Sequence, residues 1–134
     1  MLFSRAVLEQ VDLNKIDCVG GLTIGADPIA MAISLVAYID YKKIIPAFIV
    51  RKEPKKHGLQ KLIEGYQIKK GDRVLVVDDV VTTAKSTLEA IRVVEENGGI
   101  VAHVASLVDR EQGGTEALSK YRFTPIFKRS ELET

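Results

Sequence analysis

The sequence predicts a single α/β domain, in which a parallel, Rossmann-like sheet carries helices on both faces. The first observation is the uninterrupted apolar run at residues 74–77, where three of four residues are β-branched. Such a run is typical of a strand that is buried on both faces of a parallel sheet. The second observation is that four or five apolar runs alternate with helical patterns along the chain, which favours parallel strands joined by helices. A length of 134 residues with 46% hydrophobic residues suits one domain, 1–134, with its own core.

The first third of the chain predicts a helix, a strand and a second helix. Residues 2–11 have amphipathic spacing with Ser4 as a possible cap, and residues 16–19 form a short apolar strand. Asp27 is a suitable N-cap and Pro28 a suitable first residue for the helix that follows. We expect that helix over residues 29–39 and, because it is apolar on all sides, we expect it to be buried.

The rest of the chain continues the alternation of strands and helices, apart from residues 51–71. Apolar side chains spaced four, three and three apart predict a helix from Ala84 to Val94, which Asn97-Gly98-Gly99 ends. Residues 51–71 have no periodic pattern, and loops of this length are commonly lids or binding loops. The remaining elements are expected to be strands at 46–50, 74–77, 100–108 and 123–127 and a short helix from Ser130.

Composition argues against several classes of protein. A net charge of +1 gives no field that would attract nucleic acid or an anionic membrane. No segment approaches the roughly 20 apolar residues that cross a bilayer, so export and membrane insertion are not expected. Cys18 has no cysteine partner in the chain, which fits a reducing cytoplasm, and its apolar surroundings favour a core role.

The clearest functional signal is the acidic pair Asp78-Asp79 at the end of the predicted strand 74–77, followed by Thr82, Thr83 and Ser86. In open α/β sheets, ligands bind outside the carboxyl ends of strands, and the N–H groups of a helix start suit a phosphate. A Mg²⁺-binding strand of a P-loop NTPase also ends in acids, but no G-x-x-x-x-G-K-[ST] occurs here. The other alternative is a solvated strand end with aspartates in a turn.

This stretch resembles the phosphoribosyl pyrophosphate (PRPP) motif of type I phosphoribosyltransferases. The resemblance implies that Asp78 and Asp79 hold the ribose hydroxyls of PRPP, and it assigns the 5′-phosphate to the following turn. That turn consists of Val80, Val81, Thr82, Thr83, Ala84, Lys85 and Ser86. Ala84 stands where the family usually has glycine, which is costly if φ is positive, and Lys85 stands where a small residue is usual.

The glycine-rich segment 20–25 precedes the predicted helix and allows backbone N–H groups to approach an anion, although a plain connecting loop explains it equally well. In the transferase family the loop at this position receives the pyrophosphate of PRPP, and its Pro-Ile-Ala matches residues 28–30 here. Gly25 replaces the lysine that some bacterial members carry.

Residues 51–61 hold five basic residues and one acid, a charge of +4, so the rest of the chain carries −3 (1 − 4). A solvated charge run or a nucleic-acid patch would give such a cluster, but no aromatic residues interleave for stacking. The run R-K-E-x-K-x-H-G resembles the catalytic loop of orotate phosphoribosyltransferases. That resemblance implies that Arg51, Lys52, Lys55 and His57 meet the pyrophosphate, with Lys55 as the principal catalytic lysine on a flexible lid.

The segment Asp109-Arg110-Glu111-Gln112-Gly113-Gly114 is again similar to the orotate enzymes, through D-R-x-x-x-G. The resemblance implies that Arg110 pairs with the carboxylate of orotate, a bidentate task suited to guanidinium, and that Thr82 supports the base. His103 is expected to be a sheet residue.

The resemblance therefore implies transfer of phosphoribose from PRPP to orotate, giving orotidine 5′-phosphate and pyrophosphate. Mg²⁺ would be carried by PRPP without direct protein ligands, and the catalytic group would comprise Lys55, His57, Asp78 and Asp79. The family pattern also implies a homodimer whose lid, residues 51–71, reaches the neighbouring site. The family has an N-terminal hood over the base that the sequence does not show, so we expect weak transfer activity. The alternatives are a regulatory or partner-dependent protein that binds PRPP or nucleotides, and a transferase for another base.

Overall fold

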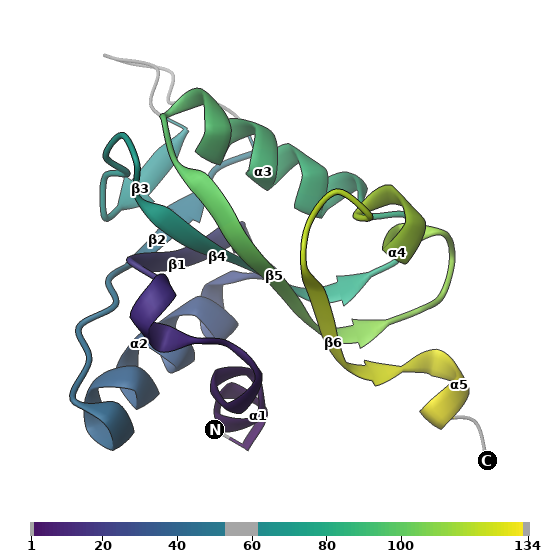
Figure 1. Cartoon of the computed structure of the whole chain (residues 1–134). Helices are drawn as coiled ribbons and strands as arrows, with labels where there is room; N and C mark the ends of the chain where they lie inside the picture. The colour runs from purple at the N-terminus through teal and green to yellow at the C-terminus, as the bar shows by residue number, and fades with distance from the viewer. Residues whose placement is uncertain (1, 53–61, 133–134) are drawn as a thin grey trace.

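The computed structural model describes residues 2–52 and 62–132, which form a six-stranded sheet between two layers of helices (Figure 1). The strand order is β3-β2-β1-β4-β5-β6, and every neighbouring pair is parallel except β2 and β3. The predicted α/β class is thereby confirmed. The elements are α1 (Leu2–Gln10), the 3₁₀ helix η1 (Leu13–Lys15), β1 (Cys18–Leu22), α2 (Asp27–Tyr41), β2 (Ala47–Val50), β3 (Ile63–Gly65), β4 (Arg73–Val81), α3 (Lys85–Glu96), β5 (Ile100–Asp109), α4 (Gly114–Ala117), β6 (Phe123–Lys128) and α5 (Arg129–Leu132).

The apolar run in β4 is explained by the two layers that cover it. Leu75 and Val77 point into a core shared with α1 and α2, whereas Val74 and Val76 point into a second core shared with α3. All four side chains are at most 1% exposed. Figure 1 shows α3 on one face of the sheet and α1 and α2 on the other. A strand covered on both faces needs apolar residues at every position, which is why the run does not alternate.

The expectation of one continuous loop over residues 51–71 is wrong at β3, which pairs with β2 in the antiparallel direction. The pairing begins where the N–H of Arg51 donates to the carbonyl of Leu62 at 2.6 Å. Three residues are too few to show an alternating pattern, and Gly65, with φ of 85°, ends the strand. The predicted lid residues Lys55 and His57 lie outside the described residues.

Two of the three glycines in the predicted phosphate loop belong to β1 instead. A Cβ atom on Gly21 would lie 2.1 Å from the carbonyl oxygen of Val77, and one on Gly20 would lie 2.4 Å from that of Phe48. These glycines therefore allow β1 to pack closely between its neighbours, and only Gly25 lies in the loop. The strand runs over 18–22, further than the predicted 16–19, because glycines lower strand propensity without preventing a buried pairing.

Both predicted helix caps are wrong. Ser4 lies within α1, and its buried hydroxyl has no hydrogen-bond partner among the described residues. Asp27 is the first residue of α2 and does not cap it, because its carboxylate accepts a hydrogen bond from the hydroxyl of Thr23 at 2.7 Å. Although α2 is apolar, no helix in the described part of the chain has the length and hydropathy to cross a membrane.

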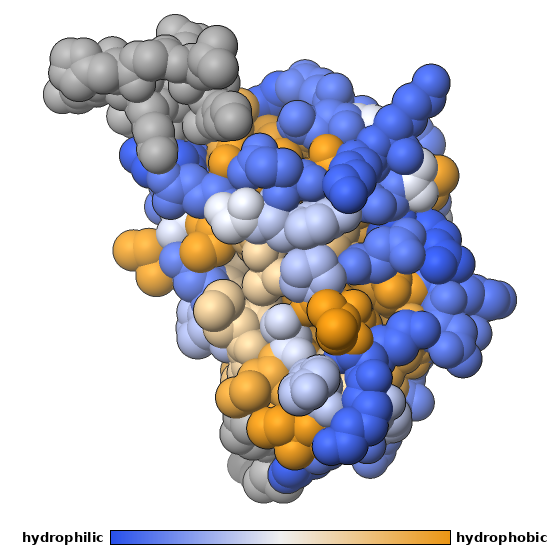
Figure 2. Space-filling view, turned by 90° about the vertical axis from the view of Figure 1, so that its left-hand side faces the viewer, coloured by the Kyte–Doolittle hydropathy of each residue, from blue (hydrophilic) through white to orange (hydrophobic). Residues whose placement is uncertain are grey.

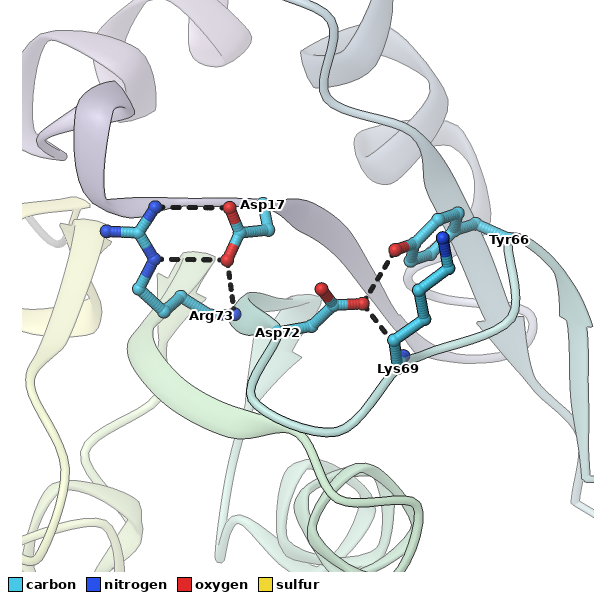
Figure 3. Close-up of polar contacts among 5 residues, drawn as sticks. All are labelled: Asp17, Tyr66, Lys69, Asp72 and Arg73. Atoms are coloured by element: carbon cyan, nitrogen blue, oxygen red, sulfur yellow. Dashed lines mark hydrogen bonds and ion pairs between the residues drawn. The ribbon is translucent and has the colours of Figure 1, made fainter.

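Polar contacts join the amino ends of the two central strands, β1 and β4 (Figure 3). The guanidinium of Arg73 bonds both oxygens of Asp17, at 3.0 and 3.1 Å, and the Arg73 N–H bonds the same carboxylate at 2.7 Å. These bonds hold the pKa of Asp17 below its usual value. The pair is exposed and contributes at most about 1 kcal/mol, but it helps to set the register that places the carboxyl ends of β1 and β4 side by side.

Candidate functional site

The acidic pair lies within β4, which continues to Val81, and does not end the strand as predicted. Successive residues of a strand point to opposite faces. Asp78 is consequently 6% exposed, whereas Asp79 faces solvent. The two carboxyl groups differ in environment although they are adjacent in sequence.

Hydrogen bonds fix the carboxylate of Asp78. It accepts from the N–H of Asp79 at 2.8 Å and from the hydroxyl of Thr87, in the first turn of α3, at 3.2 Å. Burial raises the pKa of Asp78 to about 7, and the neighbouring Asp79 carboxyl adds to the shift. The pair thus contains one group that changes charge near neutral pH.

A cavity of about 240 Å³ opens beside the pair, between the loop after β1 and the start of α3. It lies outside the carboxyl ends of β1 and β4, where the strand order changes direction, the usual ligand position in such sheets. The cavity brings together residues from three of the sequence motifs: Gly25, Lys52, Asp78, Asp79, Val80 and Ser86.

Gly25 is small because it lies against the acidic pair. A Cβ atom at this position would be 2.5 Å from Oδ1 of Asp79 and 2.8 Å from Oδ1 of Asp78. A lysine at this position would have to displace the carboxylates. In the same loop the peptide bond between Thr23 and Ile24 is cis.

The turn between β4 and α3 has a strained backbone at Ala84, where the sequence could not decide the sign of φ. Ala84 has φ of 71° and is 3% exposed, so an alanine occupies a left-handed position that favours glycine. A small cavity of about 40 Å³ lies in the turn, and it is lined by Asp78, Val80, Val81, Thr82, Ala84, Lys85, Ser86 and Thr87. Thr83, the remaining predicted turn residue, is exposed. The ammonium of Lys85 makes no hydrogen bond or ion pair with another described residue.

Arg51 and Lys52, adjacent in the sequence, take part in different contacts. Arg51 pairs with Glu64 of β3 at 2.6 Å. A cavity of about 470 Å³ adjoins this pair and is lined by Thr23, Asp27, Ile49, Arg51, Lys52 and Glu64. Lys52 lines this cavity as well as the one beside the acidic pair. Two of the four predicted lid cations are therefore placed next to the site.

Arg110 directly follows β5, and its N–H donates to the carbonyl of Val81 at 2.9 Å. This bond brings the predicted base-binding residue to the edge of the turn that contains Thr82. The Arg110 side chain is exposed, and within residues 2–52 and 62–132 it has no ion-pair partner. Its guanidinium is therefore available to an anionic ligand.

Two other residues with reactive side chains are structural. Burial raises the pKa of the Cys18 thiol to about 12, which keeps it protonated, in accord with the predicted core role. His103 lies in β5 with 7% exposure and forms a 2.7 Å hydrogen bond with the hydroxyl of Thr124. Its burial lowers its pKa, so the imidazole is neutral at pH 7.

Sequence reasoning missed three residues that shape the site: Thr87, Asp109 and Gly114. Thr87 contacts Asp78, and a Cβ atom on Gly114 would be 2.7 Å from the carbonyl oxygen of Thr82. Asp109 accepts two hydrogen bonds in the loop that holds Arg110. The signal was partly available, because Asp109 and Gly114 are the first and last residues of D-R-x-x-x-G and Thr87 follows the turn, but the sequence alone assigned these residues no role.

A site of this composition, with a carboxylate pair, a hydroxyl-rich turn and nearby lysines at the carboxyl edge of a doubly covered parallel sheet, is suited to a phosphorylated sugar. The model of the phosphoribosyl transferase domain matches residues 3–130. The chain belongs to this family, and it is similar to several curated orotate phosphoribosyltransferases.

Individual relatives agree with this assignment. The orotate phosphoribosyltransferase of Aquifex aeolicus (strain VF5) is 47% identical over 133 residues, which cover 98% of this chain and 72% of the relative. That of Tropheryma whipplei (strain Twist) is 49% identical over 109 residues, or 81% of this chain. This match covers 50% of the relative, so the chain spans about half the length of some curated relatives.

Among solved structures, the Mycobacterium tuberculosis H37Rv orotate phosphoribosyltransferase in complex with PRPP superimposes with a TM-score of 0.82 at 38% identity. The match covers 98% of this chain and 74% of that chain. It supports the type I phosphoribosyltransferase fold across nearly the whole sequence.

Proposed function

We propose that this chain uses PRPP to transfer phosphoribose to orotate, forming orotidine 5′-phosphate and releasing pyrophosphate. The observation that carries the proposal is the cavity shared by Gly25, Lys52, Asp78, Asp79 and Ser86, which come from three separate segments. The relatives named above support orotate as the acceptor, as does the exposed guanidinium of Arg110 at the edge of the turn.

Each group has a chemical role in the proposed reaction. The carboxylates of Asp78 and Asp79 accept hydrogen bonds from the two ribose hydroxyls, and the turn with Thr82 and Ser86 receives the 5′-phosphate. The bond from ribose C1 to pyrophosphate breaks, a bond from C1 to the orotate nitrogen forms, and the proton of that nitrogen is released to the pyrophosphate or to water. Negative charge then grows on the leaving group, where Arg51, Lys52, Lys55 and His57 would stabilise it.

Mg²⁺ is part of the proposal as a companion of PRPP. Among the described residues no group of three or more His, Cys, Asp or Glu side chains is placed to hold a metal ion. The two carboxylates beside the cavity would help to order a hard cation through the ribose oxygens or water, and the phosphate oxygens of PRPP would be its direct ligands. When bound, Mg²⁺ would neutralise charge on the pyrophosphate.

We also propose that the protein is a homodimer. The segment 28–39 contains no charged residue, yet α2 and its flanks expose large apolar side chains. These are Ile24, Met31, Leu35, Tyr38, Ile39, Tyr41 and Ile44, each between 47% and 79% exposed. Apolar surface gathers on this side of the molecule (Figure 2). A two-fold partner would cover this largely apolar face with its own copy, and a stable interface buries about 800 Å² per partner.

The transfer reaction is tested by incubating the protein with PRPP, Mg²⁺ and orotate, and by detecting pyrophosphate and orotidine 5′-phosphate. Adenine, guanine, hypoxanthine and uracil are the parallel arms. Product with orotate and not with the others supports the proposal. Product with another base alone would make it a different phosphoribosyltransferase, and PRPP binding without any product would favour the regulatory alternative.

The dimer is tested by sedimentation, with Leu35→Glu as the variant that should give monomer. If the lid crosses the interface, a mixed dimer of Lys55→Ala and Asp78→Asn,Asp79→Asn subunits regains activity, because one of its sites has both groups intact. A wild-type protein that stays monomeric at micromolar concentration contradicts both statements.

A further inference from the structure

The loop from Asp109 to Thr115 is closed around one buried carboxylate. Asp109, the last residue of β5, is 1% exposed. Its Oδ1 accepts from the N–H of Glu111 at 2.9 Å, and its Oδ2 accepts from the hydroxyl of Thr115 at 2.8 Å. Both ends of the loop are therefore tied to the same side chain.

Glu111 holds the middle of this loop. Its φ of 57° lies in the left-handed region, which costs a residue with a side chain roughly 1–2 kcal/mol. Two contacts oppose that cost: the N–H bond to Asp109, and a hydrogen bond of 2.7 Å in which Oε1 of Glu111 accepts from the N–H of Ser130 in α5. The second bond lowers the pKa of Glu111. Asp109 and Glu111, the two neighbours of Arg110, are thus both anchored.

The same loop is pinned to the proposed phosphate turn. The N–H of Arg110 bonds the carbonyl of Val81, as described above. A Cβ atom on Gly114 would lie 2.4 Å from Cγ1 of Val81 and 2.7 Å from the carbonyl oxygen of Thr82. Backbone therefore packs directly on backbone where the two loops meet.

We propose that Asp109 is a positioning residue for recognition of the base, because its carboxylate fixes the backbone from which Arg110 presents its guanidinium. The inference rests on the proposed function, in which Arg110 pairs with the carboxylate of the base. Arg110 has a long side chain that must be ordered when it binds. A backbone fixed in advance reduces the conformational entropy lost in that step. Asp109 itself touches no ligand and acts only through Arg110.

The test compares two ligands by calorimetry. Ribose 5-phosphate engages only the acidic pair and the turn, whereas orotidine 5′-phosphate adds the base. Asp109→Ala should lower the affinity for orotidine 5′-phosphate about tenfold and change that for ribose 5-phosphate less than about twofold. Asp109→Asn should retain most of the difference, because its carbonyl can still accept from the N–H of Glu111.

Asp72 provides a matched control at the opposite edge of the sheet (Figure 3). Its carboxylate also accepts one backbone N–H, from Lys69 at 2.8 Å, and one hydroxyl, from Tyr66 at 2.6 Å. Asp72→Ala should therefore loosen a loop of the same kind without changing the ratio of the two affinities. If Asp109→Ala does not fold, Thr115→Val removes a single bond to the same carboxylate and should shift the ratio in the same direction.

An unchanged ratio in both Asp109→Ala and Thr115→Val overturns the inference. Equal losses for the two ligands also overturn it, since they would mark Asp109 as a purely structural residue. If the wild-type protein binds orotidine 5′-phosphate no more tightly than ribose 5-phosphate, Arg110 does not recognise the base and the inference is wrong as well. A wild-type protein that binds neither ligand overturns the proposed function itself.

Discussion

The hydroxyl of Thr87 donates a 3.2 Å hydrogen bond to the buried carboxylate of Asp78, and so joins the first turn of α3 to β4. This bond favours the charged carboxylate, but burial and the adjacent Asp79 act in the opposite direction and prevail. Helix α3 is thereby attached to a group whose charge changes near neutral pH.

Asp78 should make a contribution to stability that is lost as pH rises from about 4 to about 7. Over this range the folded state keeps a proton on Asp78, with its pKa of about 7, whereas the unfolded chain has lost it near the ordinary value of 3.8. The folded state binds the additional proton, so raising the pH favours unfolding. Urea denaturation of the wild type and of Asp78→Asn at several pH values measures the effect, because the other titrating groups are common to both proteins and the difference isolates Asp78. A difference between the two profiles that does not change with pH would show that Asp78 is ionised in the folded protein.

Replacing Gly21 with alanine should mainly lower stability, whereas replacing Gly25 with alanine should mainly lower the affinity for PRPP. At Gly21 the new methyl group meets the backbone carbonyl of Val77, which cannot move without disturbing the sheet, so we expect a loss of about 1–3 kcal/mol or more. At Gly25 it meets side-chain oxygens of the acidic pair, which can give way more easily than backbone, although the exposed Asp79 would lose the hydrogen bond from the N–H of Val80 if it turned aside. Gly25→Ala should therefore lower the unfolding free energy less than Gly21→Ala does but lower PRPP affinity at least tenfold. A Gly25→Ala variant with wild-type affinity would show that the loop does not adjoin the bound ligand.

Ala84→Gly should cost almost nothing, whereas Ala90→Gly should cost about 1.5–2 kcal/mol. Both alanines are buried in the same core, at 3% and 1% exposure, so each substitution loses a similar methyl contact and adds glycine entropy. Only Ala84 has a positive φ, and relief of roughly 1–2 kcal/mol offsets the loss there. Thermal or urea unfolding of the two variants measures the difference. Equal losses at both positions would mean that Ala84 carries no strain.

Most of the sheet could be predicted, because strands buried on both faces consist almost entirely of apolar residues and this pattern is visible in the sequence. The expected strands at 100–108 and 123–127 each fall one residue short of β5 and β6. β3 and α4, with three and four residues, are too short to show a period. The caps at Ser4 and Asp27 failed because tertiary contacts, the burial of Ser4 and the bond from Thr23, overrode the local preference.

The candidate site likewise has features that the sequence predicted and features that it could not predict. The acidic pair and the turn were found because contiguous residues carry them, and the structure places Gly25, Lys52 and Ser86 in the same cavity. The ion pair between Arg51 and Glu64 was not predictable, because Glu64 lies in a strand that the sequence did not reveal. The role of Asp109 in holding the loop around Arg110 could not be predicted either, because its hydrogen bonds form only in the folded loop.

The most direct test of the account is the affinity for PRPP in the presence of Mg²⁺, measured by calorimetry for the wild type and for Asp78→Asn,Asp79→Asn. Hydrogen bonds to charged groups contribute about 1.5–3 kcal/mol each, so the double variant should bind at least about tenfold more weakly. Asp17→Asn,Asp72→Asn removes the same number of carboxyl groups at the opposite edge of the sheet and should bind like the wild type. Wild-type affinity in the Asp78→Asn,Asp79→Asn protein would contradict the assignment of the acidic pair to the ribose of PRPP.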